Sequence, residues 1–289
     1  MHTPRVFDVH AHLISNDPIR YPYAPLGGVV DASALEDPMT AERVLEEMRM
    51  TGVERAVAVQ RAHVYGTDNR YVVDSASTYP QNFSALVLIN SLAGDGAASV
   101  HHWVGRRRAV GVRLTAPSQR CGLEWLCSPG ALAVWDAAAD AGASMRVHFY
   151  TYNREAGLRQ TLELAARYSA TPIVIDHLSN VAVRPEGPDY GLDDPLKALS
   201  QRPNVSIMFS TINVTKSAAA STSLAPLIAR MSREFGPGRL MWGSDVGQSK
   251  PAYAQMVAMA IDSVALLPEA DRNEVLWATA ERVYLGRAV

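Results

Sequence analysis

The sequence predicts an α/β protein built as a single (β/α)8 TIM barrel over residues 1–289. Short runs rich in Val, Ile and Leu alternate with segments of helical period, which is typical of parallel strands covered by crossover helices. Eight such units in 289 residues match the usual size of one barrel. The first run reads VFDVHAH, whereas a doubly wound nucleotide-binding sheet would open with a glycine-rich turn.

The elements follow one another in a regular order. The predicted strands are 5–10, 53–60, 84–90, 109–115, 144–150, 172–177, 204–210 and 239–244. The predicted helices are 40–51, 68–80, 95–107, 130–142, 154–169, 192–201, 222–235, 251–266 and 269–283. Thr40 stands where the N-cap of the first helix is expected. The stretch 13–39 is longer than a plain connector, and such loops often line or cover a site.

Composition argues against several classes of partner. A net charge of -2 and a pI near 6.4 do not suit a nucleic-acid-binding surface. No apolar run reaches the roughly 18 residues that a membrane helix needs. Cys121 and Cys127 are too few for a disulfide framework, and no apolar leader is seen, so we expect a cytoplasmic protein with a small-molecule substrate. Apolar residues on more than one side of 251–266 and 269–283 permit a homodimer.

Ionisable residues close several of the predicted strands. His10 and His12 follow the first strand, His148 ends the fifth, His177 ends the sixth, and Asp245 comes just after the eighth. In a barrel of this kind the chemistry lies at the carboxyl ends of the strands. Residues i and i+2 of a strand point the same way, so His10 and His12 are expected to face one point above the barrel.

This set of side chains predicts a metal site. Neutral imidazoles with one carboxylate suit zinc, and manganese with less selectivity, so the expected ligands are His10, His12, His148 and Asp245. A bound divalent ion lowers the pKa of its water toward about 7, and Asp245 would take the proton of that water. Each member also has a structural interpretation, because a strand-end histidine such as His177 is often only hydrogen-bonded, and Asp245 could cap a helix.

Six segments spread over almost the whole chain resemble the amidohydrolase superfamily. The similarity is to its branch of TIM-barrel hydrolases that includes 2-pyrone-4,6-dicarboxylate lactonase and related sugar-acid and muconolactone-type lactonases. The segments are FDVHAHL at 7–13, YPYAP at 21–25, VQRAHVYGTDN at 59–69, GVRL at 111–114, IVIDHLSN at 173–180 and LMWGSD at 240–245.

The resemblance implies a hydrolase that opens a small, carboxylated lactone. It assigns Asp245 as general base and His177 as the residue that polarises the carbonyl or steadies the site. It also implies that Arg113 holds a substrate carboxylate, a task that suits its forked guanidinium, although a salt bridge at the barrel rim is an equal alternative. Further candidates for substrate contact are His63, Tyr65 and Asn69 after the second strand, Tyr21 and Tyr23 on the long loop, and Arg120 and Lys250.

Several alternatives stay open. The pyrone lactonase type works without an ion and lacks the fifth-strand histidine; His148 here favours the metal-dependent reaction, but a metal-free lactonase remains an alternative. A metal-dependent amidohydrolase or a decarboxylase is another, although such decarboxylases typically carry glutamate at the position of His10. A further alternative, from outside the enzymes, is a non-catalytic barrel that keeps these residues as remnants. Met208 stands where the relatives usually have lysine, and 246–250 reads VGQSK where many have a Trp-Pro pair, so the substrate ring is not defined.

Overall fold

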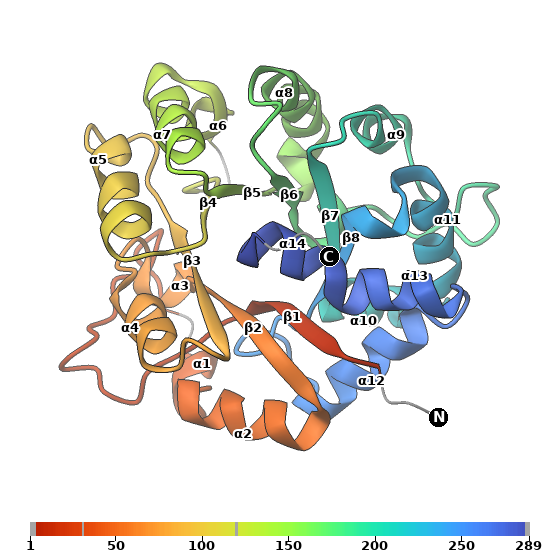
Figure 1. Ribbon diagram of the computed structural model, residues 1–289, viewed down its shortest axis with the longest axis horizontal. Helices are drawn as coiled ribbons and strands as arrows, with labels where there is room; N and C mark the ends of the chain where they lie inside the picture. Colours follow the sequence, from red (N-terminus) through yellow and green to blue (C-terminus); the bar gives the residue numbers. More distant parts are fainter. Residues whose placement is uncertain (1–3, 31, 119–120, 287–289) are drawn as a thin grey trace.

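The computed structural model describes residues 4–30, 32–118 and 121–286. Eight parallel strands lie in sequence order within one sheet and form a nearly closed barrel, so the predicted fold is confirmed (Figure 1). The strands are β1 (Val6–Ala11), β2 (Val53–Val59), β3 (Phe83–Leu88), β4 (Gly111–Thr115), β5 (Ser144–His148), β6 (Ile173–Ile175), β7 (Val205–Ser210) and β8 (Leu240–Gly243).

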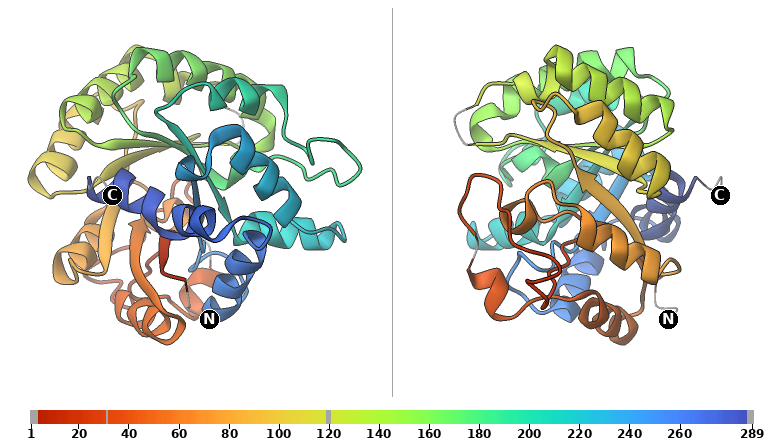
Figure 2. Two further views of the ribbon diagram at one scale, coloured as in Figure 1. Left: turned by 45° about the vertical axis from the view of Figure 1, so that its right-hand side comes forward. Right: turned by 90° about the vertical axis from the view of Figure 1, so that its left-hand side faces the viewer.

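Helices cover this barrel around its outside and at one end (Figures 1 and 2). They are α1 (Ser33–Glu36), α2 (Ala41–Thr51), α3 (Ala62–Tyr65), α4 (Arg70–Thr78), α5 (Gly96–Val100), α6 (Glu124–Cys127), α7 (Pro129–Asp140), α8 (Arg154–Arg167), α9 (Asp194–Ser200), α10 (Thr211–Ala219), α11 (Ala225–Phe235), α12 (Tyr253–Ser263), α13 (Glu269–Asn273) and α14 (Thr279–Leu285). Thr40 is the N-cap of α2, as predicted, because its side chain accepts a hydrogen bond from the backbone N–H of Arg43.

Two local differences from the prediction lie next to each other in the barrel. The helix α10 directly follows β7, where no helix is predicted, and it starts with Ser210 and Asn213 exchanging hydrogen bonds around its first turn. The strand β6 ends at Ile175 rather than at residue 177. From His177 to Asn180 the chain takes positive φ angles of 50° to 54°, a left-handed turn that L-residues rarely form.

A buried aspartate fastens the first strand to the segment after the last. One carboxylate oxygen of Asp8 accepts hydrogen bonds from the backbone N–H of His10 at 2.9 Å and of Ser244 at 2.8 Å. Its other oxygen accepts from the hydroxyl of Tyr253 at 3.0 Å. The backbone N–H of Asp245 then donates to the carbonyl of His10 at 2.8 Å. These bonds place Asp245 beside the histidines of β1.

The end of the barrel where the strands begin is apolar and covered. Phe7, Val9 and Met241 pack in one buried cluster with Trp277 and Tyr284 from the C-terminal segment. In Figure 1, α14 lies over the centre of the ring. The opposite end is therefore the one where functional side chains can gather. Among the described residues, no helix combines the length and apolar character that crossing a membrane requires.

The long connection between β1 and α2 lies on the side of the barrel away from both termini (Figure 2, right). Tyr65 holds its start, because the tyrosine hydroxyl accepts a hydrogen bond from the backbone N–H of Ser15 at 2.8 Å. The backbone N–H groups of Ala24 and Leu26 donate to carbonyls of Val64 and Ala62. The segment is thus fixed over the carboxyl ends of the strands by the turn that follows β2.

Candidate active site

Four of the five strand-end residues meet in one buried cluster. His10 and His12 come from β1 and its end, His177 from the turn after β6, and Asp245 from the segment after β8. All four side chains are buried. The rings of His10 and His12 have centroids 4.7 Å apart, and those of His10 and His177 are 4.8 Å apart. The expectation that chemistry lies at the carboxyl ends of the strands therefore identifies side chains that the fold brings together.

His10, His12 and Asp245 form a small triangle of polar atoms. The Nε2 atoms of His10 and His12 are 3.1 Å apart. Each of them lies 3.6 Å from Oδ1 of Asp245. That oxygen is buried and has no hydrogen-bond partner among the described residues, whereas Oδ2 accepts from the hydroxyl of Ser249 at 2.8 Å. A buried carboxylate oxygen without a partner is costly, so its position points to a ligand, a water or an ion there.

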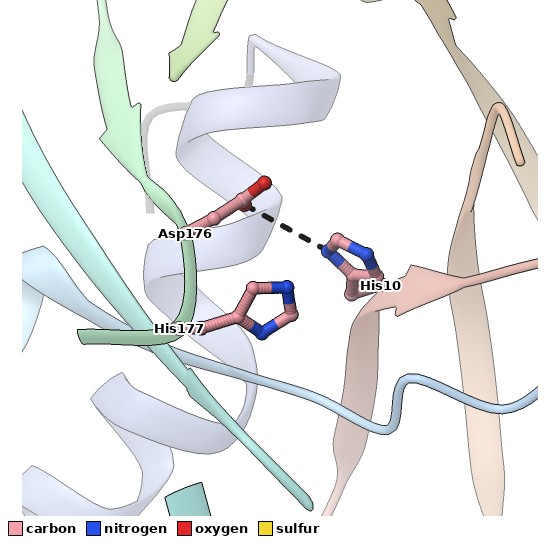
Figure 3. A group of neighbouring side chains, drawn as sticks. All are labelled: His10, Asp176 and His177. Carbon is pink, nitrogen blue, oxygen red and sulfur yellow. Dashed lines mark ion pairs between the residues drawn. The ribbon is translucent and has the colours of Figure 1, made fainter. Parts of the chain in front are cut away.

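Asp176 forms a second group with His10 and His177, whose side chains face one another in Figure 3. The two oxygens of Asp176 are engaged by arginines: Nε of Arg113 donates to Oδ2 at 2.8 Å, and Nε of Arg146 donates to Oδ1. Burial opposes ionisation, but the two guanidinium groups outweigh it and hold the pKa of Asp176 below its usual range. Asp176 is therefore an ionised partner of arginines and is poorly placed to bind a cation.

Arg146 is the residue with the most contacts in this network. It lies inside β5, fully buried, and its Nη1 donates to the carbonyl of Val9 at 2.6 Å. Its Nη2 is 2.8 Å from Nδ1 of His10, and Nη1 is 3.3 Å from the hydroxyl of Tyr284. Arg146 thereby joins Asp176 to the first histidine of the HxH pair. Neither Arg146 nor Asp176 is among the residues predicted from the sequence.

The left-handed turn after β6 positions His177. Its backbone carbonyl accepts from the side-chain amide of Asn213 at 2.8 Å, and its Nδ1 lies 2.7 Å from the hydroxyl of Ser210. Its backbone N–H donates to the sulfur of Met208 at 3.1 Å. Met208, at a position where the resemblance predicts lysine, thus supports the histidine turn. Backbone strain of this kind is commonly found at functional sites.

His148 lies at the edge of the cluster. Its ring packs against those of His177 and Tyr150, with centroids 5.4 and 4.9 Å away. Its Nδ1 lies 3.9 Å from Oδ2 of Asp176 and has no hydrogen-bond partner within the described ranges. His148 does not belong to either group of side chains close enough to share one ion. Its side chain is 15% exposed, more than any of the other members, so the cluster reaches solvent on this side.

The predicted substrate-contacting residues fall into two sets. Arg113 lies in the cluster: its Nε pairs with Asp176, and its Nη groups make no hydrogen bond to the residues the structure describes. Tyr65 and Tyr23 instead pack against each other at 6.2 Å, and Tyr21 packs on Tyr71 while its hydroxyl donates to Asp74 at 2.9 Å.

Two more of these residues lie near the turn after β2. The side chain of Asn69 bonds to the backbone of Leu88 and Thr67, and His63 is exposed on α3. Lys250 is exposed after β8, and Arg120 lies outside the described residues. Among the members of the set that the structure describes, Arg113 is the one that lies with the histidines.

Burial controls the protonation of the cluster. It raises the pKa of Asp245 to about 7, although the hydrogen bond from Ser249 and the charges of Arg61 and Arg113 oppose the rise. Burial also lowers the pKa of His10 and of His12 well below the ordinary value, with help from nearby arginines. The histidines are therefore neutral at physiological pH, while Asp245 exists in both forms.

The hydrogen bonds fix which nitrogen of each neutral imidazole carries its proton. Nδ1 of His12 lies 2.9 Å from the carbonyl of Val59, which only accepts, so that nitrogen is protonated and Nε2 of His12 has a lone pair. Arginine only donates, so Nδ1 of His10 must accept from Arg146 and the proton of His10 is on Nε2. The contact between the two Nε2 atoms is then a hydrogen bond from His10 to His12.

These assignments test whether a metal ion fits. By distance, His10, His12 and Asp245 could hold one, since ligands about 2.1 Å from a tetrahedral zinc lie about 3.4 Å apart. His12 offers a lone pair and Asp245 an unpartnered oxygen, but Nε2 of His10 carries a proton. The hydrogen bond from Arg146 therefore leaves two suitable ligand atoms, which is an incomplete fit.

Sequence reasoning missed Arg61, Arg146, Asp176 and Ser249. Arg61 follows β2, is buried and contacts the side chain of Gln248. Arg146 and Asp176 could have been found from the sequence, because each is a charged residue inside or next to an apolar run, SMRVH at 144–148 and IVID at 173–176. A charge buried in such a run requires a partner. Strand-end position alone did not direct attention to them.

Comparison with known proteins agrees with the fold. The family model described as Amidohydrolase matches residues 7–285. No curated protein matches the chain. The fold is similar to that of a candidate 2-pyrone-4,6-dicarboxylic acid hydrolase from Pseudomonas putida, with 20% identity, 100% of both chains covered and a TM-score of 0.76.

Two further solved structures share the fold. An amidohydrolase from Burkholderia multivorans with bound zinc has 18% identity, covers 97% of this chain and 99% of its own, and has a TM-score of 0.74. A dihydroxybenzoic acid decarboxylase from Polaromonas sp. with bound manganese and an inhibitor has 13% identity, 99% and 98% coverage and a TM-score of 0.68. Because the family model spans nearly the whole barrel, including every strand-end residue of the cluster, this chain belongs to the amidohydrolase family.

Proposed function

We propose that this protein is a hydrolase that opens a small, carboxylated lactone. The observation that supports it best is the buried Oδ1 of Asp245, which has no partner among the described residues and lies 3.6 Å from two imidazole nitrogens, one a donor and the other an acceptor. Nε2 of His10 donates and Nε2 of His12 accepts. When a water and a carbonyl oxygen displace the hydrogen bond between these two nitrogens, the water finds two acceptors for its protons, Asp245 and Nε2 of His12, and the carbonyl oxygen finds a donor in Nε2 of His10.

In this reaction Arg113 binds the carboxylate of the lactone through its Nη groups, which the pairing with Asp176 leaves available. The carbonyl oxygen accepts a hydrogen bond from Nε2 of His10. Ionised Asp245 takes one proton of the water while the water oxygen forms a bond to the carbonyl carbon. The ring C–O bond then breaks, and Asp245 returns the proton to the leaving alkoxide, so lactone and water give a hydroxy acid.

The metal-dependent form of the same hydrolysis is the second candidate, with zinc or manganese and the predicted ligands His10, His12, His148 and Asp245. The distances among His10, His12 and Asp245 favour it, although His148 lies outside that triangle, and an amidohydrolase of this fold contains zinc. When bound, such an ion would acidify water and polarise the carbonyl. Purification without chelators followed by metal analysis separates the two: full activity with well under one equivalent of metal rules out this second form.

The test of the proposed function is a panel of lactones with and without a ring carboxylate. We expect the carboxylated members to be opened, and Asp245→Asn to lower kcat by about 10²- to 10⁴-fold. Asp136→Asn is the matched control, because Asp136 lies on α7 and bonds to Tyr168 at 2.7 Å, away from the cluster. If the protein opens no lactone but releases carbon dioxide from a carboxylated phenol, it is a decarboxylase and the proposed function is wrong.

A further inference from the structure

Arg146 takes no direct part in the proposed hydrolysis. Its side chain is fully buried in the barrel, does not reach the unpartnered oxygen of Asp245, and contacts no group that titrates in the reaction. Placing a guanidinium there requires charge neutralisation, which Asp176 provides. Arg146 contacts the residues proposed to react, Asp245, His10 and His12, through the 2.8 Å hydrogen bond from its Nη2 to Nδ1 of His10.

We propose that Arg146 is a positioning residue that keeps the proton of His10 on Nε2, so that His10 donates to the substrate carbonyl and does not bind a metal ion. Guanidinium groups cannot accept hydrogen bonds, so the tautomer with the proton on Nδ1 would place two N–H groups against each other. The role of His10 as a hydrogen-bond donor to the carbonyl rests on the proposed function. The tautomer of His10 and its effect on metal binding do not.

Two side chains lie near Nδ1 of His10, a donor from Arg146 and an acceptor from Asp176. Oδ1 of Asp176 lies 3.7 Å away, beyond hydrogen-bond distance, because Arg146 stands closer. A histidine that binds a metal usually donates its other ring N–H to a carboxylate or carbonyl, as Nδ1 of His12 does here with Val59. Removing Arg146 would let His10 turn its Nδ1 proton toward Asp176. The lone pair would then be on Nε2, completing a three-ligand set with His12 and Asp245.

The first test is the tautomer in the intact protein. Nitrogen-15 NMR of protein labelled at histidine, with the His10 signals assigned by their loss in His10→Asn, distinguishes a protonated from an unprotonated ring nitrogen. We expect His10 to show an unprotonated Nδ1 and a protonated Nε2. A protonated Nδ1 in the metal-free protein would overturn the proposal without affecting the evidence for lactone hydrolysis.

The second test is zinc affinity, measured by competition with a chromophoric chelator. Arg146→Met is compared with Arg113→Met, which removes the same charge from the same carboxylate without touching His10. We expect Arg146→Met to bind zinc at least tenfold more tightly than Arg113→Met, in the range that outer partners of metal ligands usually contribute. Equal affinities would mean that charge alone matters and would overturn the proposal.

Activity gives an independent readout. Without added metal, Arg146→Met should lower kcat by about 10²-fold or more, as loss of one donor to a developing oxyanion does, with less effect on KM. The wild-type tautomer needs no variant at position 146, so a poorly folded Arg146→Met would leave the first test decisive. If no lactone is opened by the wild-type protein, the proposed function fails while the NMR and zinc results still decide the role of Arg146.

Discussion

Asp176 and Asp245 show how two buried carboxylates in one site acquire opposite properties. Both are almost inaccessible to solvent. Asp176 lies between two guanidinium groups, which hold its pKa down. Asp245 has a serine hydroxyl on one oxygen and no hydrogen-bond partner on the other within the part of the chain that the structure describes, so burial dominates and raises its pKa to about 7. A carboxylate of this kind accepts a proton readily near neutral pH, as a general base must.

The pH profile follows from that value. The base acts only when ionised, so kcat/KM should rise with pH, with a midpoint near pH 7, and level off above it. The hydrogen bond from Ser249 stabilises the ionised form, so Ser249→Ala should move the midpoint to higher pH. Initial rates measured from pH 3 to 9 check both proteins. A midpoint near pH 4, typical of an exposed carboxylate, would contradict the assignment of Asp245.

Sequence reasoning at the residue scale succeeded where chemistry coincides with strand ends. His10, His12, His177 and Asp245 were found because each lies within two residues of a strand end, and the barrel brings strand ends together. Arg146 was missed because it lies inside β5, and its partner Asp176 lies in the turn after β6. Pairing between distant segments depends on register, and the residues alone do not specify it.

At the scale of elements, the turn from His177 to Asn180 is the most unusual part of the fold. Four consecutive non-glycine residues have φ between 50° and 54°. Each costs about 1–2 kcal/mol relative to the right-handed form. Surrounding bonds hold the turn: Arg154 donates to the carbonyl of Ser179 at 2.6 Å, and Asn180 donates to that of Phe149 at 2.7 Å. The strain orients His177 toward His10.

Ser179 offers a way to measure this strain. Its hydroxyl is buried and unpartnered within the described chain, and its φ is 52°. Ser179→Gly should raise the free energy of unfolding by about 1 kcal/mol, because glycine adopts this conformation without a Cβ penalty and the unpaired hydroxyl is removed. Ser232→Gly, in the regular helix α11, should instead lower it by about 0.5 kcal/mol.

Urea denaturation monitored by circular dichroism checks both variants. A loss of stability in Ser179→Gly, as large as that in the helical control, would show that the turn is not strained.

The sequence predicted the strands better than the helices after them. Apolar runs located all eight strands, since both faces of a barrel strand are buried and the run is continuous. The helix α10 was missed because TINVTKSAA carries no apolar stripe on one face. Ser210 with Asn213 three residues later was the available signal for its start.

At the scale of the whole molecule, the two ends of the barrel have different tasks. Where the strands begin, Trp277 is buried, lies 5.6 Å from Phe7 and has the guanidinium of Arg5 at 3.6 Å over its ring. Where the strands end, buried polar groups face one another. Burial of large aromatic side chains at the first end supplies stability that the strained and charged second end does not.

Trp277→Ala tests this division. It should lower the free energy of unfolding by about 3 kcal/mol, as truncation of a buried tryptophan usually does, while leaving KM nearly unchanged. Trp103, which is only half-buried, provides the control: Trp103→Ala should cost about 1 kcal/mol or less. Denaturation and steady-state kinetics on the same preparations check the pair. A large rise in KM in Trp277→Ala would mean that the two ends are coupled.

The central claim is that a lactone carbonyl lies between Asp245, His10 and His12 while its carboxylate binds Arg113. A crystal structure of Asp245→Asn with an intact carboxylated lactone tests it most directly. We expect the carbonyl oxygen within hydrogen-bond distance of Nε2 of His10, and a water about 3–3.5 Å from the carbonyl carbon beside residue 245. A lactone bound instead in the cavity of about 540 Å³ lined by Thr151 and 180–194, with no contact to the histidines, would contradict the claim.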